Sequence, residues 1–161
     1  MKKEIRQLSD NEVTQALDLC WDVFYECSAS DCTPEGREEF WRSLDHEYMI
    51  SRMGDGAVRA WGAFADGRLC GACFIKEPCN IELLFVETAS QRKNIGSSLL
   101  KRAVMDARRA DETVMRVTVS ALKSAYGFFE KHGFKRLGDE EAYDGVPRTL
   151  MEIRGVIEII V

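Results

Sequence analysis

The stretch that decides the fold is IELLFVETASQRKNIGSSLL, residues 81–100. It begins with an apolar run over 81–86, continues as a polar loop over 88–94, and then shows apolar side chains at helical spacing over 95–107. This order predicts a strand, a loop and a helix. The loop and first helical turn would present unpaired backbone N–H groups, to which the helix dipole adds partial positive charge. Because Gly96 lacks a Cβ, a ligand can come close, so the stretch predicts an anion site of the kind that binds phosphate.

Two segments resemble the landmarks of a known enzyme family. QRKNIG (91–96) resembles the pyrophosphate loop of the GNAT superfamily of N-acetyltransferases, and LFV before it (84–86) resembles that family's fourth strand. Downstream, VTVSALKSAYGFFEKHGF (117–134) is similar to the second landmark, a strand followed by a helix that ends in Tyr-Glu-Lys-Leu-Gly-Phe. With IR at 5–6 and the hairpin-like segment 61–75, the resemblance covers nearly the whole chain.

The resemblance implies both a fold and a co-substrate. The fold would be α/β, with a mixed, largely antiparallel central sheet flanked by helices. Its fourth and fifth strands would splay apart at the cofactor site. The pantetheine arm of acetyl-CoA, the acetyl donor, would insert between them and pair with backbone groups near Phe85 and Val86. The other residues expected at the cofactor are Gln91, Arg92, Lys93, Asn94, Ile95, Gly96, Ser97 and Phe129.

Three positions depart from the family pattern. Asn94 stands where the family usually has the first glycine of the loop, but asparagine tolerates a positive φ better than most residues, so we expect the loop to form. Phe129 stands where many members have the tyrosine that protonates the departing thiolate, and Ser120 stands where close relatives often have an asparagine. These departures motivate an alternative to the enzyme, a non-catalytic coenzyme A-binding sensor or interaction domain with a GNAT fold.

Acetyl transfer to an amine needs a proton acceptor, because a free alkylamine has a pKa of about 10 and only its neutral form attacks. Glu82 is the candidate base. Strand alternation would place Glu82 on the same side as Val86 if no bulge intervenes, and a backbone N–H near Val86 would stabilise the oxyanion. Asn80 aligns most directly with the base of relatives but cannot act as one. The alternative for Glu82 is a solvated or salt-bridged strand glutamate.

The absence of the family tyrosine leaves the proton donor open. A thiol with a pKa of about 8.5 can leave unprotonated at modest cost, and Tyr126 and Ser120 are candidate catalytic substitutes. Phe129 itself either belongs to the core or packs against the thioester end of the cofactor. We interpret His132 as a surface residue, because it lies beside the helix-ending Gly133.

The acceptor pocket has the weakest signal, because residues 20–55 and 138–148, which would build it, are the least motif-like parts of the chain. The sequence therefore predicts an acetyl-CoA-dependent N-acetyltransferase that acts on the primary amine of a small molecule or peptide by direct attack on the thioester. Transfer of a longer acyl group is a further alternative. The aromatic residues that either wall this pocket or belong to the core are Tyr25, Trp41, Tyr48 and Tyr143.

Length and composition are typical of one domain. The chain has 161 residues, 45% hydrophobic and 30% charged, so we expect a single GNAT-like acetyltransferase domain over residues 1–161. Its net charge of −5 argues against nucleic acid as a partner. No membrane span or signal-peptide core is visible, which predicts a cytoplasmic protein without membrane contact. The apolar tail 156–161 suggests either an extension of the last strand or a contact in a homodimer.

Six cysteines raise the question of metal or redox chemistry. Cys70 and Cys73 have redox-motif spacing, but they lie in a predicted strand, 69–75, where alternation would point them to opposite faces. Zinc would need two further ligands with suitable spacing, so we expect no metal site and buried thiols instead.

Three further elements are predicted from local signals. A helix that opens at Pro34 would carry Phe40, Trp41, Leu44 and Tyr48 along one side. An Asp-Gly turn would join strands 58–65 and 69–75 in a hairpin. The β-branched alternation over 113–119 predicts a strand.

Overall fold

The computed structural model describes residues 2–155, so the prediction for the tail 156–161 lies outside the described residues. Within that range one sheet runs in the order β1-β2-β3-β4-β5-β8-β6, and β7 pairs with β8. Only the β4/β5 pair is parallel among these strands, which confirms the mixed, largely antiparallel sheet. The strands are β1 (Lys3–Gln7), β2 (Val58–Ala65), β3 (Arg68–Lys76), β4 (Asn80–Val86), β5 (Arg116–Leu122), β6 (Lys135–Arg136), β7 (Glu141–Tyr143) and β8 (Val146–Arg154).

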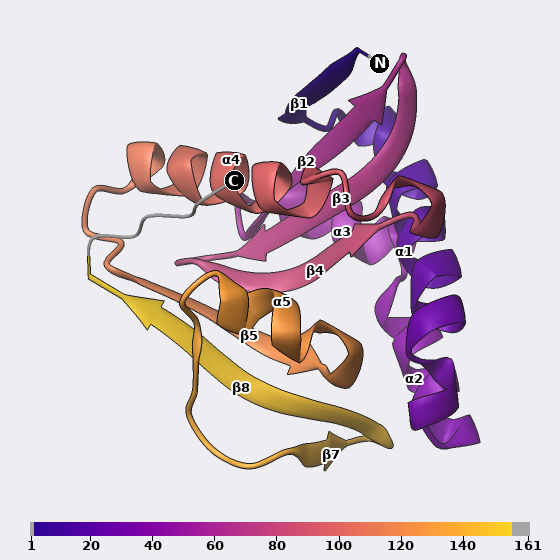
Figure 1. Ribbon diagram of the computed structural model, residues 1–161. Coiled ribbons are helices and arrows are strands. Elements are labelled where there is room, and N and C mark those ends of the chain that lie inside the picture. Colours follow the sequence, from indigo (N-terminus) through magenta and orange to yellow (C-terminus); the bar gives the residue numbers. More distant parts are fainter. Residues whose placement is uncertain (1, 156–161) are drawn as a thin grey trace.

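Helices cover both faces of the sheet. In Figure 1, α4 and α5 lie in front of it, whereas α1 and α3 pass behind it. No helix among residues 2–155 is long and apolar enough to cross a membrane. The helices are α1 (Val13–Cys27), α2 (Pro34–Ser43), α3 (His46–Gly54), α4 (Ile95–Ala110) and α5 (Tyr126–Lys131).

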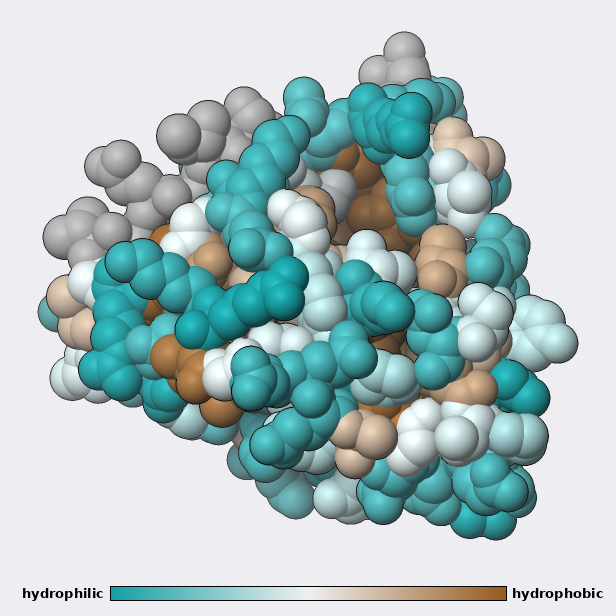
Figure 2. Space-filling view, turned by 60° about the horizontal axis from the view of Figure 1, so that its bottom comes forward, coloured by the Kyte–Doolittle hydropathy of each residue, from teal (hydrophilic) through white to brown (hydrophobic). Residues whose placement is uncertain are grey.

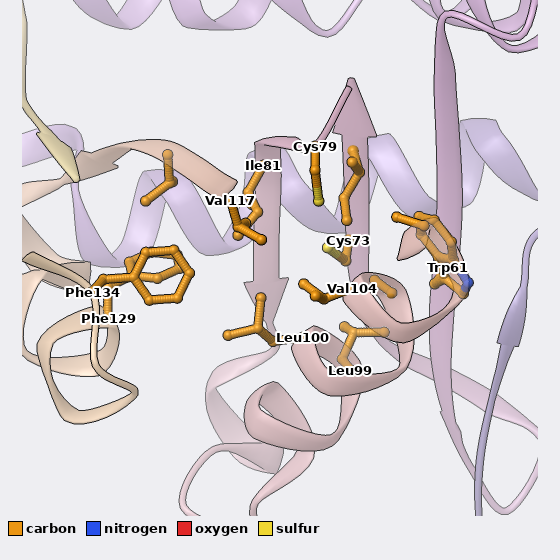
Figure 3. Close-up of a cluster of buried hydrophobic side chains, with 14 of the residues drawn as sticks. Trp61, Cys73, Cys79, Ile81, Leu99, Leu100, Val104, Val117, Phe129 and Phe134 are labelled. Atoms are coloured by element: carbon orange, nitrogen blue, oxygen red, sulfur yellow. The ribbon is translucent and has the colours of Figure 1, made fainter. Parts of the chain in front are cut away.

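The core on the α4 face fixes that helix against the central strands (Figure 3). Leu99, Leu100 and Val104 share one side of α4 because they recur at helical spacing, and they pack with Cys73 of β3 and Ile81 of β4. All five side chains are at most 2% exposed. Burying a large aliphatic side chain contributes about 1.5–3 kcal/mol. The start of α4 is therefore anchored beside the end of β4.

The core on the opposite face joins α1, α2 and α3 to the same strands. Phe24 of α1 and Phe40 of α2 stack with ring centroids 3.8 Å apart, and Met49 of α3 is 2% exposed. Phe40 also meets Phe85 of β4 edge to face at 6.0 Å. These contacts bring α2 to the end of β4 from the side opposite α4.

The helix that opens at Pro34 ends earlier than predicted. It stops at Ser43, and α3 begins at His46 because the Asp45 carboxylate caps it, accepting the Tyr48 backbone N–H at 2.7 Å. The four apolar residues predicted along one side of this helix do not share one environment. Phe40 and Leu44 are buried, whereas Trp41 and Tyr48 are 54% and 61% exposed.

The strand predicted over 113–119 begins later, at Arg116. The Asp111 carboxylate accepts both the backbone N–H and the hydroxyl of Thr113, at 3.0 and 2.6 Å. This local side-chain hydrogen bonding holds a turn where the β-branched pattern favours a strand. The hairpin of β2 and β3 forms as predicted around Asp66 and Gly67, both with positive φ.

The alternation argument for Cys70 and Cys73 is wrong. The β2/β3 register shifts between Ala63 and Phe64, which pair with Gly71 and Leu69 and leave Cys70 as an extra residue. Both thiols therefore belong to the core on the α4 face. All six cysteines are free, and five of them are buried.

Candidate functional site

The splay between β4 and β5 opens a cavity in the sheet. The two strands pair only at Asn80 with Thr118 and at Ile81 with Val119, and beyond these positions they diverge. The cavity between them has a volume of about 390 Å³. Hydrophobic residues are also visible at the bottom of a hollow with a largely hydrophilic rim in the space-filling view (Figure 2). The diverging edges leave backbone groups of both strands without a strand partner, as the predicted insertion of an extended ligand requires.

One end of the cavity is the loop between β4 and α4. Gln91 Nε2 donates to the Val86 carbonyl at 2.8 Å, which ties the loop to the end of the strand. Asn94 begins the helix with φ 59° and ψ 16°, so this asparagine adopts the left-handed conformation that was expected of it. Arg92 is also left-handed, with φ 64°. The expected cofactor residues that line the cavity are Phe85, Val86, Gln91, Arg92, Asn94, Ile95, Gly96, Ser97 and Phe129.

Gly96 lies in the first turn of α4, close to two side chains of the cavity wall. A Cβ added there would be 3.2 Å from Cε1 of Phe128 and 3.6 Å from Cγ2 of Val86. A larger side chain would have to displace Phe128, which lines the same cavity. The missing Cβ therefore keeps this end open. Lys93, the remaining expected cofactor residue, is exposed and is not among the described lining residues.

Glu82 lines the cavity, but the prediction of its direction is wrong. The β3/β4 register pairs Phe74 with Leu83 and Ile75 with Ile81, so Glu82 is the extra residue of a β-bulge. The bulge reverses the alternation: Val86 packs on the α4 face, whereas Glu82 reaches Arg52 of α3 behind the sheet.

Glu82 and Arg52 form an ion pair in a partly buried position. Arg52 Nη2 lies 2.5 Å from Glu82 Oε1, and their side chains are 17% and 25% exposed. The carboxylate raises the pKa of Arg52, chiefly through this hydrogen bond. The alternative interpretation of Glu82, a salt-bridged strand glutamate, therefore describes its contact with Arg52. No hydrogen bond from residues 2–155 engages the other oxygen, Oε2, which leaves it able to accept a proton or a hydrogen bond.

The residue in place of the family tyrosine, Phe129, and its two candidate substitutes, Ser120 and Tyr126, differ in whether they line the cavity. Phe129 is 3% exposed and packs edge to face with Phe128 and tilted against Phe134, each at 5.2 Å, so it is a core residue that also forms cavity wall. Ser120 lines the cavity. Tyr126 does not belong to the described lining, and its hydroxyl donates to Glu140 at 2.8 Å. The structure therefore brings Ser120, and not Tyr126, to the site.

His132 is buried, which corrects its interpretation as a surface residue. It is 6% exposed, its Nε2 lies 2.7 Å from the Ser97 hydroxyl oxygen, and its ring meets that of Phe128 at 4.8 Å. Burial lowers the pKa of His132, and the charge of Lys131 lowers it further. A neutral imidazole therefore supports Ser97 in the first turn of α4.

The end of the cavity away from the loop before α4, called the acceptor end because the predicted acceptor would enter there, contains polar residues that the sequence analysis did not single out. Arg148 of β8 and Ser124 line the cavity there, and the Ser124 hydroxyl lies 2.8 Å from that of Ser28. No sequence motif marks Arg148, which reaches the cavity through the long-range pairing of β8 with β5, and Ser124 lies within the landmark 117–134 without a role assigned to it. The four aromatic residues suggested for the pocket wall are 45% to 61% exposed and are not among the described lining residues: Tyr25, Trp41, Tyr48 and Tyr143.

Comparisons with known proteins agree on one fold. The family model described as an acetyltransferase (GNAT) domain matches residues 28–154. A search of curated proteins found no match. Among solved structures, the chain is similar to a GCN5-related N-acetyltransferase from Rhodopseudomonas palustris, with 19% identity, 96% of each chain covered and a TM-score of 0.80.

Two further solved structures are similar over almost their whole length. One is the PaiA N-acetyltransferase from Thermoplasma acidophilum in complex with coenzyme A, with 23% identity, 96% of this chain and 99% of that chain covered, and a TM-score of 0.76. The other is the ribosomal-protein-alanine N-acetyltransferase from Brucella melitensis, with 16% identity, 94% and 99% covered, and a TM-score of 0.67. At these identities the likeness shows the fold.

Proposed function

Because this chain belongs to the GNAT family of acetyltransferases, we propose that it transfers the acetyl group of acetyl-CoA to a primary amine of a small molecule or peptide. The observation that carries the proposal is the cavity between β4 and β5, which has the loop before α4 at one end and Glu82 in its wall. The relative from Thermoplasma acidophilum, of the same fold, was solved in complex with coenzyme A.

The residues present fit a coenzyme A thioester. The pantetheine arm carries amide groups, which would pair with the open edge of β4 near Phe85 and Val86. The pyrophosphate would accept from the first-turn N–H groups of α4, where Gly96 leaves room. Arg92 and Lys131, both exposed lining residues, would supply positive charge to the phosphates.

Glu82 would serve as the proton acceptor of the reaction. An amine near neutral pH is mostly an ammonium ion, with a pKa of about 10, and must lose a proton before its nitrogen attacks the thioester carbonyl carbon. Glu82 Oε2 would take that proton directly or through a water molecule, while Arg52 holds Oε1. A β4 backbone N–H near Val86 would donate to the oxyanion.

The leaving thiolate does not require the missing tyrosine. A thiol with a pKa of about 8.5 is a fair leaving group at neutral pH. Ser120 lines the cavity and is the candidate donor that remains from the sequence analysis. When the thiolate leaves, the carbon–sulfur bond breaks and the carbon–nitrogen bond is complete. The nitrogen then gives up its second proton, which the thiolate takes through Ser120 or water, and the first proton, held by Glu82, returns to solvent.

Thiol release in the presence of acetyl-CoA and a broad panel of amines tests this function. We expect calorimetry to show acetyl-CoA binding, and we expect at least one primary amine to accelerate thiol release well above the rate without amine. Binding of acetyl-CoA with no acceleration by any amine would overturn the proposed amine acetylation, because the donor site would then exist without this reaction.

A further inference from the structure

Arg148 is a cation at the acceptor end of the cavity. It lies on β8 opposite Leu122 of β5, and its Nη1 donates to the Ser120 carbonyl at 3.2 Å. Its guanidinium carbon stands 5.9 Å from the centroid of the Phe40 ring. Since Phe40 belongs to the core on the α1 and α2 face, this charge lies on the opposite side of the sheet from the loop before α4.

No carboxylate neutralises Arg148 among residues 2–155. The ion pairs within 4.0 Å in this range do not include it, although they include nine other arginines. Glu141 is its cross-strand neighbour on β7 and still forms no such pair with it. Burial lowers the pKa of Arg148, but a guanidinium stays protonated in proteins. The fold therefore holds an uncompensated positive charge in a poorly solvated place, which is costly without a ligand.

The guanidinium keeps donors available to the cavity. A guanidinium has five N–H donors, and the recorded hydrogen bond to Ser120 uses one of them. The Nε and Nη2 atoms of Arg148 make no hydrogen bond within residues 2–155. Neither of them is a fully buried atom without a partner, so both retain accessible surface. Because Arg148 lines the cavity, an acceptor bound there can accept from this planar fork.

We propose that Arg148 binds a carboxylate of the acceptor, so that the acceptor is an amine that also carries a carboxylate, such as a free amino acid. This inference rests on the proposed function and names the substrate class of the same site. Glu82 and Arg148 line one cavity, and their opposite charges match the ammonium and carboxylate groups of such a molecule. A guanidinium fork pairs with a carboxylate through two parallel hydrogen bonds.

A carboxylate suits this end better than a phosphate does. One guanidinium balances one negative charge, whereas a phosphate monoester near neutral pH carries close to two. The excess charge would share a cavity with the Glu82 carboxylate, and like charges repel each other.

Acceptor binding can be measured apart from turnover by saturating the protein with coenzyme A, which has no acetyl group to transfer. Calorimetry would compare L-amino acids with their carboxamides, β-alanine with β-alaninamide, and each with phosphoethanolamine. We expect at least one amino carboxylate to bind wild type at least tenfold more tightly than its carboxamide. Arg148→Gln should remove that preference, and Arg148→Lys, which keeps the charge without the fork, should retain part of it.

The matched control is Arg109→Gln, since the Arg109 side chain is 72% exposed on α4 and lies outside the described cavity lining. It should keep the full preference. The proposal would be overturned if wild type bound acids and carboxamides equally, bound phosphoethanolamine more tightly, or bound no amino carboxylate. An unchanged preference in Arg148→Gln would overturn it as well. Absence of thiol release from acetyl-CoA would count against the proposed transfer reaction alone, because the binding comparison does not depend on turnover.

Discussion

The two ends of the cavity are built in different ways. The cofactor end comes mainly from one continuous piece of chain, in which β4 runs through the loop 91–94 into α4, and it would offer backbone groups to its ligand. The acceptor end is assembled from side chains of segments far apart in the sequence. Phe40 of α2 and Arg148 of β8 line it, and Arg52 of α3 holds the lining residue Glu82 from behind.

This difference indicates which property each end controls. Binding through backbone groups and a missing Cβ depends on the local conformation of the chain. Binding through assembled side chains depends on which residues the core brings together. Changes at the cofactor end should therefore weaken acetyl-CoA binding for every acceptor. Changes at the acceptor end should alter turnover or acceptor choice and leave acetyl-CoA affinity unchanged.

Removing the proposed base should have the largest effect and should confine it to turnover. Glu82→Gln keeps the size of the side chain but cannot accept a proton, so we expect kcat to fall by roughly 10²–10⁴, as is typical for loss of a general base. Affinity for acetyl-CoA, measured by calorimetry, should not change. Steady-state rates from pH 6 to 9 would show the loss.

Arg52→Gln is the matched control for this experiment, because it breaks the same ion pair and leaves the carboxylate in place. A loss shared equally by both variants would mean that Glu82 acts by holding the bulge in position. Wild-type kinetics in Glu82→Gln across the pH range would assign proton removal to water or to the free amine's own equilibrium.

Filling the cavity wall at Gly96 should have the next largest effect, at the other end. The side chain in Gly96→Val must displace Phe128 and crowd the phosphate site, so we expect acetyl-CoA to bind at least tenfold more weakly, a loss of about 1.4 kcal/mol. Gly127→Ala is the control, because a Cβ there would meet nothing within 4 Å. Asn94→Gly should be neutral or mildly favourable to binding, since residue 94 already has φ 59°. Unchanged affinity in Gly96→Val would remove the loop from the site.

The same contrast explains what could be predicted from sequence. The loop, the left-handed Asn94 and the apolar side of α4 follow from local spacing and turn chemistry, and the structure has them. Arg148 could not be found in this way, because its place in the cavity depends on distant parts of the chain, Ser120 of β5 and Phe40 of α2. The family resemblance marks the site of the shared co-substrate and leaves the acceptor unmarked.

Two errors have one cause, the β-bulge. Alternation is a reliable guide to the faces of a regular strand, but one extra residue reverses it, and no composition signal marks that residue. Glu82 and Cys70 are both such extra residues, so both predictions of direction are wrong. His132 was misread for a different reason: it packs against α4 beside Ser97, 35 residues earlier in the chain, and such a long-range contact leaves no local signal in the sequence.

Restoring the family tyrosine should have a small effect and tests whether the donor site tolerates a hydroxyl. Phe129→Tyr adds one oxygen to a 3% exposed ring that forms cavity wall, and a buried hydroxyl needs a partner, which the cofactor sulfur would provide. We expect the variant to stay folded and to match or exceed wild-type turnover at pH 7. Tyr126→Phe is the control and should leave turnover unchanged, because the Tyr126 hydroxyl contacts Glu140. A large loss of turnover in Phe129→Tyr, with the fold intact, would show that this part of the wall must remain apolar.

The smallest expected effect concerns His132, whose contact with Ser97 is a long-range element within the cofactor end. Burial is the main cause of its lowered pKa, so the unfolded chain binds a proton more readily than the folded protein does. The free energy of unfolding should therefore fall as the pH decreases from about 7.5 to 5.5, through the ordinary histidine pKa of about 6.5. His132→Gln can still contact the Ser97 hydroxyl and should flatten this decline, as measured by urea unfolding at both pH values. Ser97→Ala should keep the decline, because His132 stays buried without that partner. Wild type and His132→Gln could instead lose stability equally on acidification. In that case the burial of His132 is not the cause of the pH dependence, and the stability of the cofactor end would depend on its local contacts alone.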